Sequence, residues 1–159
     1  MTSLPSLGPR GEGWVLVQGI LFVLVVAAGV SLGGAWSGEA RTVTTVFGVV
    51  LIAVGGVLAF RGVVDLRDAL TPVPRPRVGA QLVETGSYAL ARHPIYGGIV
   101  IAALGWGLFT ASPIAVGLSV VLLGFFRLKS AREEAWLLEA YPGYEAYRAR
   151  TKRMIPFLY

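Results

Sequence analysis

The sequence has no cysteine and only one histidine, His93. Without thiols the chain forms no disulfide, offers no thiolate nucleophile and builds no cysteine-ligated zinc or iron–sulfur site. A single histidine also excludes a histidine-rich metal cluster. We therefore expect neither thiol chemistry nor a metal centre.

Charged residues are scarce as well. Only 14% of the 159 residues are charged, 55% are hydrophobic and the mean hydropathy is +0.68, whereas a soluble domain carries about 25% charged residues. The net charge of +5 comes from arginines that flank apolar spans, with no basic stripe interleaved with aromatics. This pattern indicates one membrane domain whose cations lie beside lipid, and no binding of nucleic acid.

Two long apolar segments run from about Trp14 to Gly33 and from about Thr42 to Phe60, and neither contains a charge. A helix of about 20 residues crosses a hydrocarbon core about 30 Å thick. Both segments are therefore predicted to be transmembrane helices.

A further uncharged stretch, residues 95–126, is interrupted at Thr110–Pro113. Ser112 there suits a helix N-cap and the proline after it suits the first helical position. Each arm is shorter than a full span, so we expect a helical hairpin whose inner ends continue into the cytosol, or two half-buried helices. Ser130 and Glu133 fit a capping box for a separate helix, although the fourth span could also continue through them.

The glycines of the spans indicate close contacts between helices, and none of them lies in a loop between a strand and a helix that would bind phosphate. They are Gly48, Gly55, Gly56, Gly97, Gly98, Gly105 and Gly107.

The cations predict the orientation. With the N-terminus inside, only Arg41 lies outside, and this asymmetry is typical of the positive-inside rule. Both termini are then cytoplasmic, and the composition is typical of a bacterial cytoplasmic membrane protein. The inner residues are Arg10, Arg61, Arg67, Arg75, Arg77, Arg92, Arg127, Lys129, Arg132, Arg148, Arg150, Lys152 and Arg153.

The predicted fold is all-α, a polytopic membrane protein of about four transmembrane helices with short cytosolic helices at the C-terminus. Within the single domain, residues 1–60 form an N-terminal helical pair, residues 61–81 a proline-rich cytosolic connector and residues 82–159 a C-terminal half. Alternating prolines in Thr71–Arg77 exclude a helix there.

The C-terminal tail is amphipathic and rich in charge. Pro142-Gly143 is expected to end a helix, after which Tyr144 and Tyr147 lie at i, i+3 on one face of a short second helix. Residues 154–159, Met-Ile-Pro-Phe-Leu-Tyr, are predicted to anchor at the membrane interface.

Two clusters could carry chemistry. Pro94 suits the first turn of the third span, which places Arg92 and His93 at a helix N-terminus. Free N–H groups and the helix dipole favour an anion there, and Arg92 could add a bidentate contact to a carboxylate. The alternative is that neither residue binds a ligand: Arg92 would only follow the positive-inside rule, and His93 would only lie at the membrane interface.

The second cluster is Glu133-Glu134. Adjacent carboxylates repel each other, so the pair suits a cationic ligand with hydroxyls, or a solvated helix face paired with Arg132 or Lys129. Both clusters fall at the inner ends of the two helices of one hairpin. A ligand with a carboxylate, a cation and hydroxyls, such as S-adenosylmethionine (SAM), would fit between them.

Three blocks of residues, taken in this order and spacing, resemble the isoprenylcysteine carboxyl methyltransferase and phospholipid methyltransferase superfamily. The resemblance covers about residues 82–157, roughly half of the chain. The blocks are Gly86-x-Tyr88-x3-Arg92-His93-Pro94-x-Tyr96-x-Gly98, Glu133-Glu134-x2-Leu137 and Tyr144-x2-Tyr147-x3-Thr151-x-Arg153-x-Ile155-Pro156.

The resemblance implies a SAM-dependent membrane methyltransferase that acts on a lipophilic acceptor, either the carboxylate of a prenylcysteine-like molecule or a lipid headgroup. Arg153 and Arg92 would position the acceptor. The chain has fewer spans than many carboxyl methyltransferases, so we expect its acceptor pocket to differ from theirs. The implied cofactor-binding residues are Tyr88, Arg92, His93, Pro94, Tyr96, Gly98, Glu133, Glu134, Tyr144 and Tyr147.

The sequence is also compatible with two other functions. Membrane sterol reductases resemble the superfamily in their cofactor half but bind NADPH, for whose extra phosphate no second arginine cluster is clearly free. A non-enzymatic scaffold or transport subunit is the other alternative. No span has an ionisable residue at its centre, which argues against transport.

Overall fold

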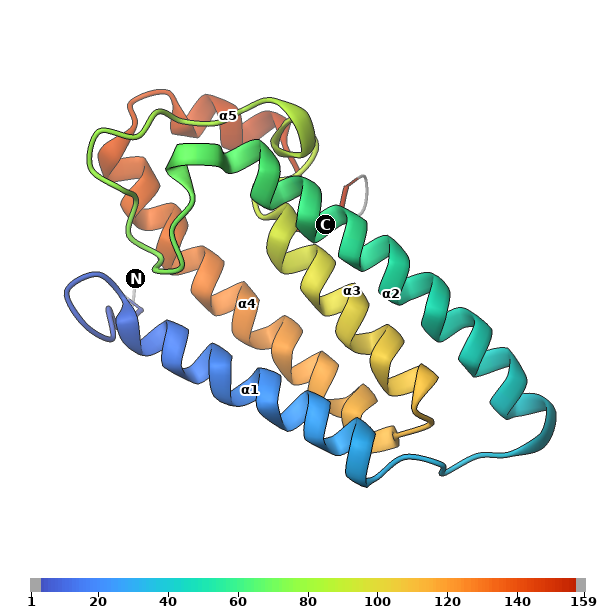
Figure 1. The fold of residues 1–159 in the computed structure, drawn as a ribbon. Helices are drawn as coiled ribbons and strands as arrows, with labels where there is room; N and C mark the ends of the chain where they lie inside the picture. The colour runs from blue at the N-terminus through green and yellow to red at the C-terminus, as the bar shows by residue number, and fades with distance from the viewer. Residues whose placement is uncertain (1–3, 157–159) are drawn as a thin grey trace.

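The computed structural model describes residues 4–156, and within them the chain is helical with no strand beyond one isolated bridge. The all-α prediction is therefore confirmed (Figure 1). The helices are α1 (Glu12–Ser31), α2 (Gly38–Leu66), α3 (Pro94–Phe109), α4 (Pro113–Ala140) and α5 (Tyr144–Arg150), with 3-10 turns η1 (Arg67–Ala69) and η2 (Gly86–Ala89).

Three stretches are long and apolar enough to cross a membrane: Glu12–Ser31, Gly38–Ala69 and Pro113–Ala140. The apolar helix α3 is shorter, at 16 residues. The 28 residues of α4 extend about 42 Å, which exceeds a core of about 30 Å. One end of α4 therefore projects beyond the apolar layer.

The turn between α3 and α4 forms as predicted. The Ser112 hydroxyl accepts from the Ala115 N–H at 3.2 Å and donates to the Ala28 carbonyl at 3.0 Å, and Pro113 begins α4. The cap closes the hairpin and also joins it to α1.

The far end of α4 corrects one prediction. The helix continues without a break through Ser130 and Glu133, so the capping box is wrong and the alternative, a continuous helix, is right. The Ser130 hydroxyl donates to the Arg127 carbonyl at 3.1 Å within the same helix. The helix ends at Ala140, just before Pro142-Gly143, as predicted.

The connector is shorter than predicted because α2 continues to Leu66 and takes residues 61–66 into the helix. Thr71–Arg77 is not helical, as its prolines require.

The consecutive helices α1 and α2 lie apart: α2 packs along α3, and α1 packs on α4 (Figure 1). The start of α1, the end of α2, the start of α3 and the end of α4 share one end of the bundle, where the connector and α5 also lie.

Glycines allow α2 and α3 to approach backbone to backbone. A Cβ on Gly55 would lie 2.4 Å from the Gly98 carbonyl oxygen, and a Cβ on Gly98 would lie 2.5 Å from the Gly55 carbonyl oxygen. Gly48 and Gly105 oppose each other in the same way. The predicted close contacts are confirmed for these glycines, whereas Gly56 faces open space among the described residues.

Gly55→Ala should therefore destabilise the protein by about 1–3 kcal/mol, because the added methyl group meets backbone atoms that cannot rotate away. Thermal unfolding in detergent would measure the loss. Gly56→Ala, one residue along the same helix, is the matched control and should be neutral or slightly stabilising, since alanine favours a helix. Equal unfolding temperatures for the two variants would contradict the packing described above.

Candidate functional site

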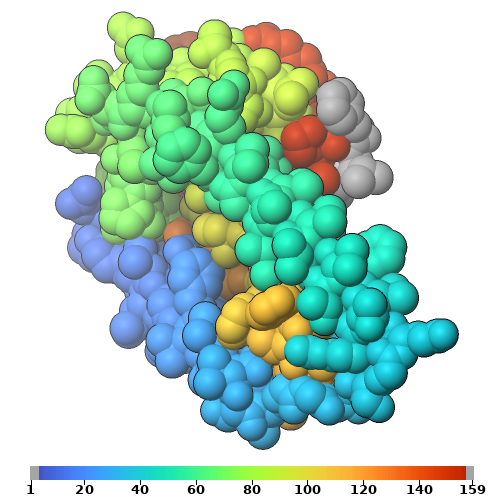
Figure 2. Space-filling view, turned by 45° about the vertical axis from the view of Figure 1, so that its right-hand side comes forward, coloured from blue at the N-terminus to red at the C-terminus, as the bar shows by residue number. Residues whose placement is uncertain are grey.

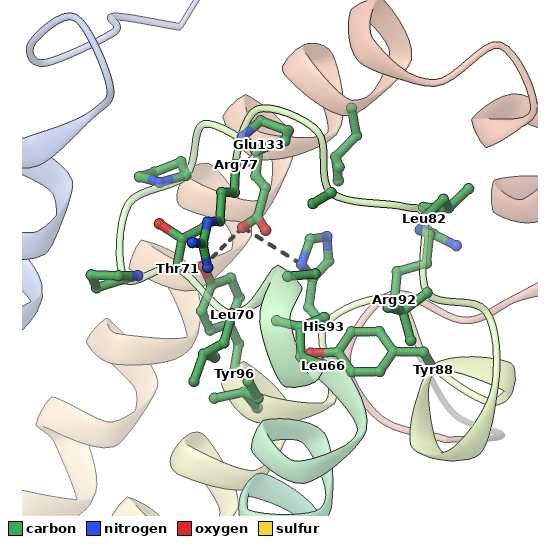
Figure 3. A pocket seen from close by; sticks show the side chains of 18 of the residues that line it. Leu66, Leu70, Thr71, Arg77, Leu82, Tyr88, Arg92, His93, Tyr96 and Glu133 are labelled. Carbon is green, nitrogen blue, oxygen red and sulfur yellow. Dashed lines mark hydrogen bonds and ion pairs between the residues drawn. The ribbon is translucent and has the colours of Figure 1, made fainter.

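A cavity of about 290 Å³ lies at the end of the bundle that the connector covers (Figure 3). Its walls come from α1, from the ends of α2, α3 and α4, from α5, and from residues 69–83, which comprise most of the connector and the two residues after it. A cavity of this size, with a mainly apolar lining and a few polar groups, is typical of a small-molecule site.

Glu133 points from α4 into this cavity, beside His93 and Tyr96 of the α3 start (Figure 3). The Tyr96 hydroxyl donates to Glu133 Oε2 at 2.8 Å, and His93 Nδ1 lies 3.8 Å from the same oxygen. The rings of His93 and Tyr96 stack with centroids 5.4 Å apart. Within residues 4–156 the other oxygen, Oε1, makes no hydrogen bond or ion pair, so Glu133 can still accept from a ligand.

Glu134 is directed elsewhere, because successive side chains on a helix point about 100° apart. It is 2% exposed and does not line the cavity. Four cationic or ionisable groups surround its carboxylate: Arg92 Nε at 2.9 Å, His93 Nε2 at 3.3 Å, Arg148 Nε at 3.4 Å and Arg153 Nη2 at 3.6 Å. Glu134 therefore joins α4 to the α3 start, to α5 and to the tail.

The tail after α5 is attached to the start of α3. The Arg92 and His93 N–H groups donate to the carbonyls of Lys152 and Arg153 at 2.9 and 2.8 Å. Arg92 also donates to the Thr151 carbonyl.

Met154 follows this segment and is fully buried; its carbonyl would lie 2.2 Å from a Cβ on Gly97. The predicted interfacial anchor is therefore wrong for Met154, and residues 157–159 of that anchor lie outside the described residues.

Buried tyrosines form another wall of the cavity. The Tyr147 hydroxyl donates to the Tyr88 carbonyl at 2.7 Å. The buried Tyr144 hydroxyl has no hydrogen-bond partner within residues 4–156. Burial raises the pKa of Tyr88, Tyr144 and Tyr147 well above the usual value, so all three remain neutral and keep an O–H to donate.

The structure brings six of the sequence-predicted residues to the cavity wall besides Glu133, and four are elsewhere. Pro94 and Gly98 pack against α2, where a side chain on Gly62 would meet Pro94 and one on Gly98 would meet Ala59. Arg153 and Glu134 face each other. The six at the wall are Tyr88, Arg92, His93, Tyr96, Tyr144 and Tyr147.

Sequence reasoning missed three contributions to the cavity: Gln18 of α1, Lys129 of α4 and the connector wall. Lys129 carried a signal, since it lies one turn before Glu133 and shares its face of the helix. Gln18 and the connector reach the site only through tertiary packing.

Glu134→Gln should loosen the tail by about 3 kcal/mol or more, because three guanidinium groups would lose their shared carboxylate. Trypsin should then cleave after Arg148, Arg150, Lys152 or Arg153 faster than in the wild type. The rate can be followed by intact-mass spectrometry.

Glu139→Gln is the matched control, because Glu139 is exposed on the same helix. Its cleavage rate should match the wild type. Equal rates for the Glu134 variant and this control would show that the ion cluster does not hold the tail.

Comparison with known proteins supports the superfamily resemblance, although the matched region begins in α2 and does not include the third block, Tyr144 to Pro156. The profile of the phospholipid methyltransferase family matches residues 43–143, more than half of the chain. A probable protein-S-isoprenylcysteine O-methyltransferase of Oryza sativa subsp. indica is 31% identical over 115 residues, which cover 70% of this chain and 60% of the relative. Protein-S-isoprenylcysteine O-methyltransferase B of Arabidopsis thaliana is 28% identical over 116 residues, with 70% and 59% covered.

A protein-S-isoprenylcysteine O-methyltransferase of Schizosaccharomyces pombe is 38% identical over 79 residues, which cover 48% of this chain and 34% of the relative. The chain spans about 60% of the length of the rice relative. The matched family region includes Glu133 and ends at Gly143, before Tyr144. On the family match and the apolar helices together, this integral membrane protein belongs to the phospholipid methyltransferase family.

Proposed function

We propose that the chain transfers a methyl group from SAM to a lipophilic acceptor at the cavity, which lies at the cytoplasmic face of a bacterial membrane. The acceptor is the carboxylate of a prenylcysteine-like molecule or a lipid headgroup. The observation that carries the proposal is the polar end of the cavity, where Glu133, His93 and Tyr96 converge beside apolar helices. The family and the names of the relatives support methyl transfer.

The cavity wall fits the chemical groups of SAM. Glu133 has a carboxylate oxygen left for an ammonium or a ribose hydroxyl. The Tyr144 hydroxyl is a buried donor with no partner within residues 4–156, and such groups are costly unless a ligand satisfies them. Tyr88, Tyr141 and Tyr147 add aromatic faces, which favour a cation or an adenine ring.

SAM supplies a methyl carbon on a sulfonium, and the transfer is an in-line displacement whose rate depends on alignment and on excluding water. The residues of this chain bind and orient the reactants. Glu133 holds the polar end of the cofactor, and the tyrosines enclose it. The connector covers the cavity, and Glu84, three residues past its end, forms an ion pair with Arg150 of α5.

The orientation follows from charge. The start of α1, the connector and the segment after α5 lie at the cavity end of the bundle, and Arg41 lies near the start of α2, at the opposite end (Figure 1). This asymmetry supports a cytoplasmic cavity, since cations gather on that side of a membrane. SAM would then arrive from the cytosol while the lipid part of the acceptor stays between the helices.

Glu133→Gln should weaken SAM binding about tenfold or more, because a charge-assisted hydrogen bond becomes a neutral one. Calorimetry on the purified protein in nanodiscs would measure the change. The same variant should lose transfer of a labelled methyl group from SAM into an S-prenylated N-acetylcysteine.

Glu139→Gln is again the control and should bind SAM as the wild type does. NADPH should bind neither protein. Saturable binding of NADPH without binding of SAM would favour a reductase over a methyltransferase, and unchanged SAM affinity in the Glu133 variant would remove this residue from the cofactor site.

Tyr144→Phe and Tyr147→Phe should affect stability in opposite directions. Without ligand, Tyr144→Phe should stabilise the protein by about 1 kcal/mol, because it removes a buried hydroxyl that lacks a partner. Tyr147→Phe should destabilise it by about as much, since it loses the bond to the Tyr88 carbonyl. SAM should bind about fivefold more weakly to the Tyr144 variant. Thermal unfolding with and without SAM tests both parts, and a destabilised Tyr144 variant with normal SAM affinity would contradict them.

A further inference from the structure

The cations around the cavity differ in what they face. Arg92 is bound to Glu134, to the Arg148 carbonyl of α5 and to the Thr151 carbonyl of the tail. Arg153 faces Glu134 outside the cavity. Arg77 is exposed on the connector and donates to the Asp68 carbonyl at 3.0 Å. His93 lies between the two glutamates. Lys129 is the remaining cation among the described lining residues.

Lys129 is buried, with 1% of its surface exposed, and its ammonium has neutral partners. Nζ donates to Gln18 Oε1 at 2.6 Å and to the Pro72 carbonyl at 3.3 Å, and it lies 5.1 Å from the centroid of the Tyr96 ring. Within residues 4–156 no carboxylate oxygen comes within 4.0 Å of it. An ammonium has three donors, and the charge of Glu133, one turn further along α4, acts on Lys129 only from beyond ion-pair distance.

The geometry points to Lys129 as the residue that binds the carboxylate of the lipophilic acceptor, an inference that rests on the proposed function. An anionic ligand group would give the ammonium a counter-charge in direct contact and take its remaining donor. Gln18 and the Pro72 carbonyl hold Nζ in place from α1 and from the connector. Lys129 is thus the cation that selects an acid as the acceptor.

The hydrocarbon part of such an acid has an apolar surface beside Lys129. Val63 and Leu66 of α2 and Ile95 and Ile99 of α3 line the same cavity. Figure 2 shows the surface hollowed between α1 and α2, with α3 visible at the bottom of the hollow. A chain that enters from the lipid between α1 and α2 would bring its head group to Lys129.

A carboxylate fits Lys129 better than a phosphate does. One ammonium matches a single negative charge, and the oxygens of Gln18 and Pro72 beside it would repel a dianion. Methyl transfer to a carboxylate needs no base: the oxygen supplies the electron pair of the new C–O bond, and the pair of the broken C–S bond stays on sulfur. The ester product is neutral and loses its attraction to Lys129, which favours release.

The test compares Lys129→Met with Lys129→Arg and Lys152→Met in nanodiscs of zwitterionic lipid. Lys152 is exposed, and it is the other lysine of the chain. The probes are dodecanoate, methyl dodecanoate and dodecyl phosphate, whose dissociation constants are measured by microscale thermophoresis. SAM affinity is measured on the same samples by calorimetry.

We expect Lys129→Met to weaken dodecanoate binding about tenfold or more and to leave the methyl ester unchanged, because only the acid has a charge for Lys129. Lys129→Arg should restore part of the preference for the acid, and Lys152→Met should behave as the wild type. Retained ester binding shows that the Met variant is folded.

Four results would overturn the inference: unchanged dodecanoate affinity, an equal loss for acid and ester, tighter binding of dodecyl phosphate than of dodecanoate, or weaker SAM binding with normal acid binding. The proposed function fails separately, if the wild type does not bind SAM. The comparison of acid and ester still decides the role of Lys129 in that case.

Discussion

The buried carboxylate of Glu134 is the interaction on which the rest of the site depends. Removing a carboxylate from water costs several kcal/mol unless cations and hydrogen bonds replace the lost solvation. Here Arg92, Arg148 and Arg153 come to it from the α3 start, from α5 and from the tail. The same attachment holds α5, with Tyr144 and Tyr147, over the cavity, and the Tyr147 hydroxyl adds its bond to the Tyr88 carbonyl.

Two adjacent glutamates therefore have two different environments. The turn of the helix separates their directions by about 100°, so Glu134 points to the arginines and Glu133 points to the cavity. Burial among cations makes Glu134 part of the structure, whereas Glu133 keeps one oxygen for a ligand. In sequence the two residues are equivalent, and only packing distinguishes them.

Local rules predicted much of the fold. Ser112 and Pro94 begin helices as capping chemistry requires, and Pro142-Gly143 lies just past the end of α4. The errors concern long-range contacts. Met154 is apolar enough for a membrane interface, but it is buried because Gly97 of α3 leaves room for its backbone. Residues 61–66 were assigned to the connector because they include charged residues. They continue α2 instead, because a helix that extends beyond the membrane can keep charged residues exposed.

The candidate site was predictable to a similar extent. Spacing placed Arg92, His93 and Glu133 at one end of a hairpin, and the superfamily resemblance supplied the cofactor. Neither showed that Arg92 and Arg153 face Glu134, because ion pairs between distant segments leave no local pattern. The sequence also did not indicate that Gln18 lines the cavity, because α1 reaches the cavity only by packing on α4.

The two charged groups left for ligands have opposite signs and lie at different depths. Lys129 precedes Glu133 by one turn of α4, about 6 Å along the axis. In the proposed orientation the ammonium therefore lies nearer the membrane and the carboxylate nearer the cytosol. A cationic methyl donor from the cytosol is drawn to Glu133, and an anionic acceptor from the lipid is drawn to Lys129. Each ligand is repelled from the other's position, so the charge order along one helix face would hold the methyl donor and the acceptor side by side in one cavity.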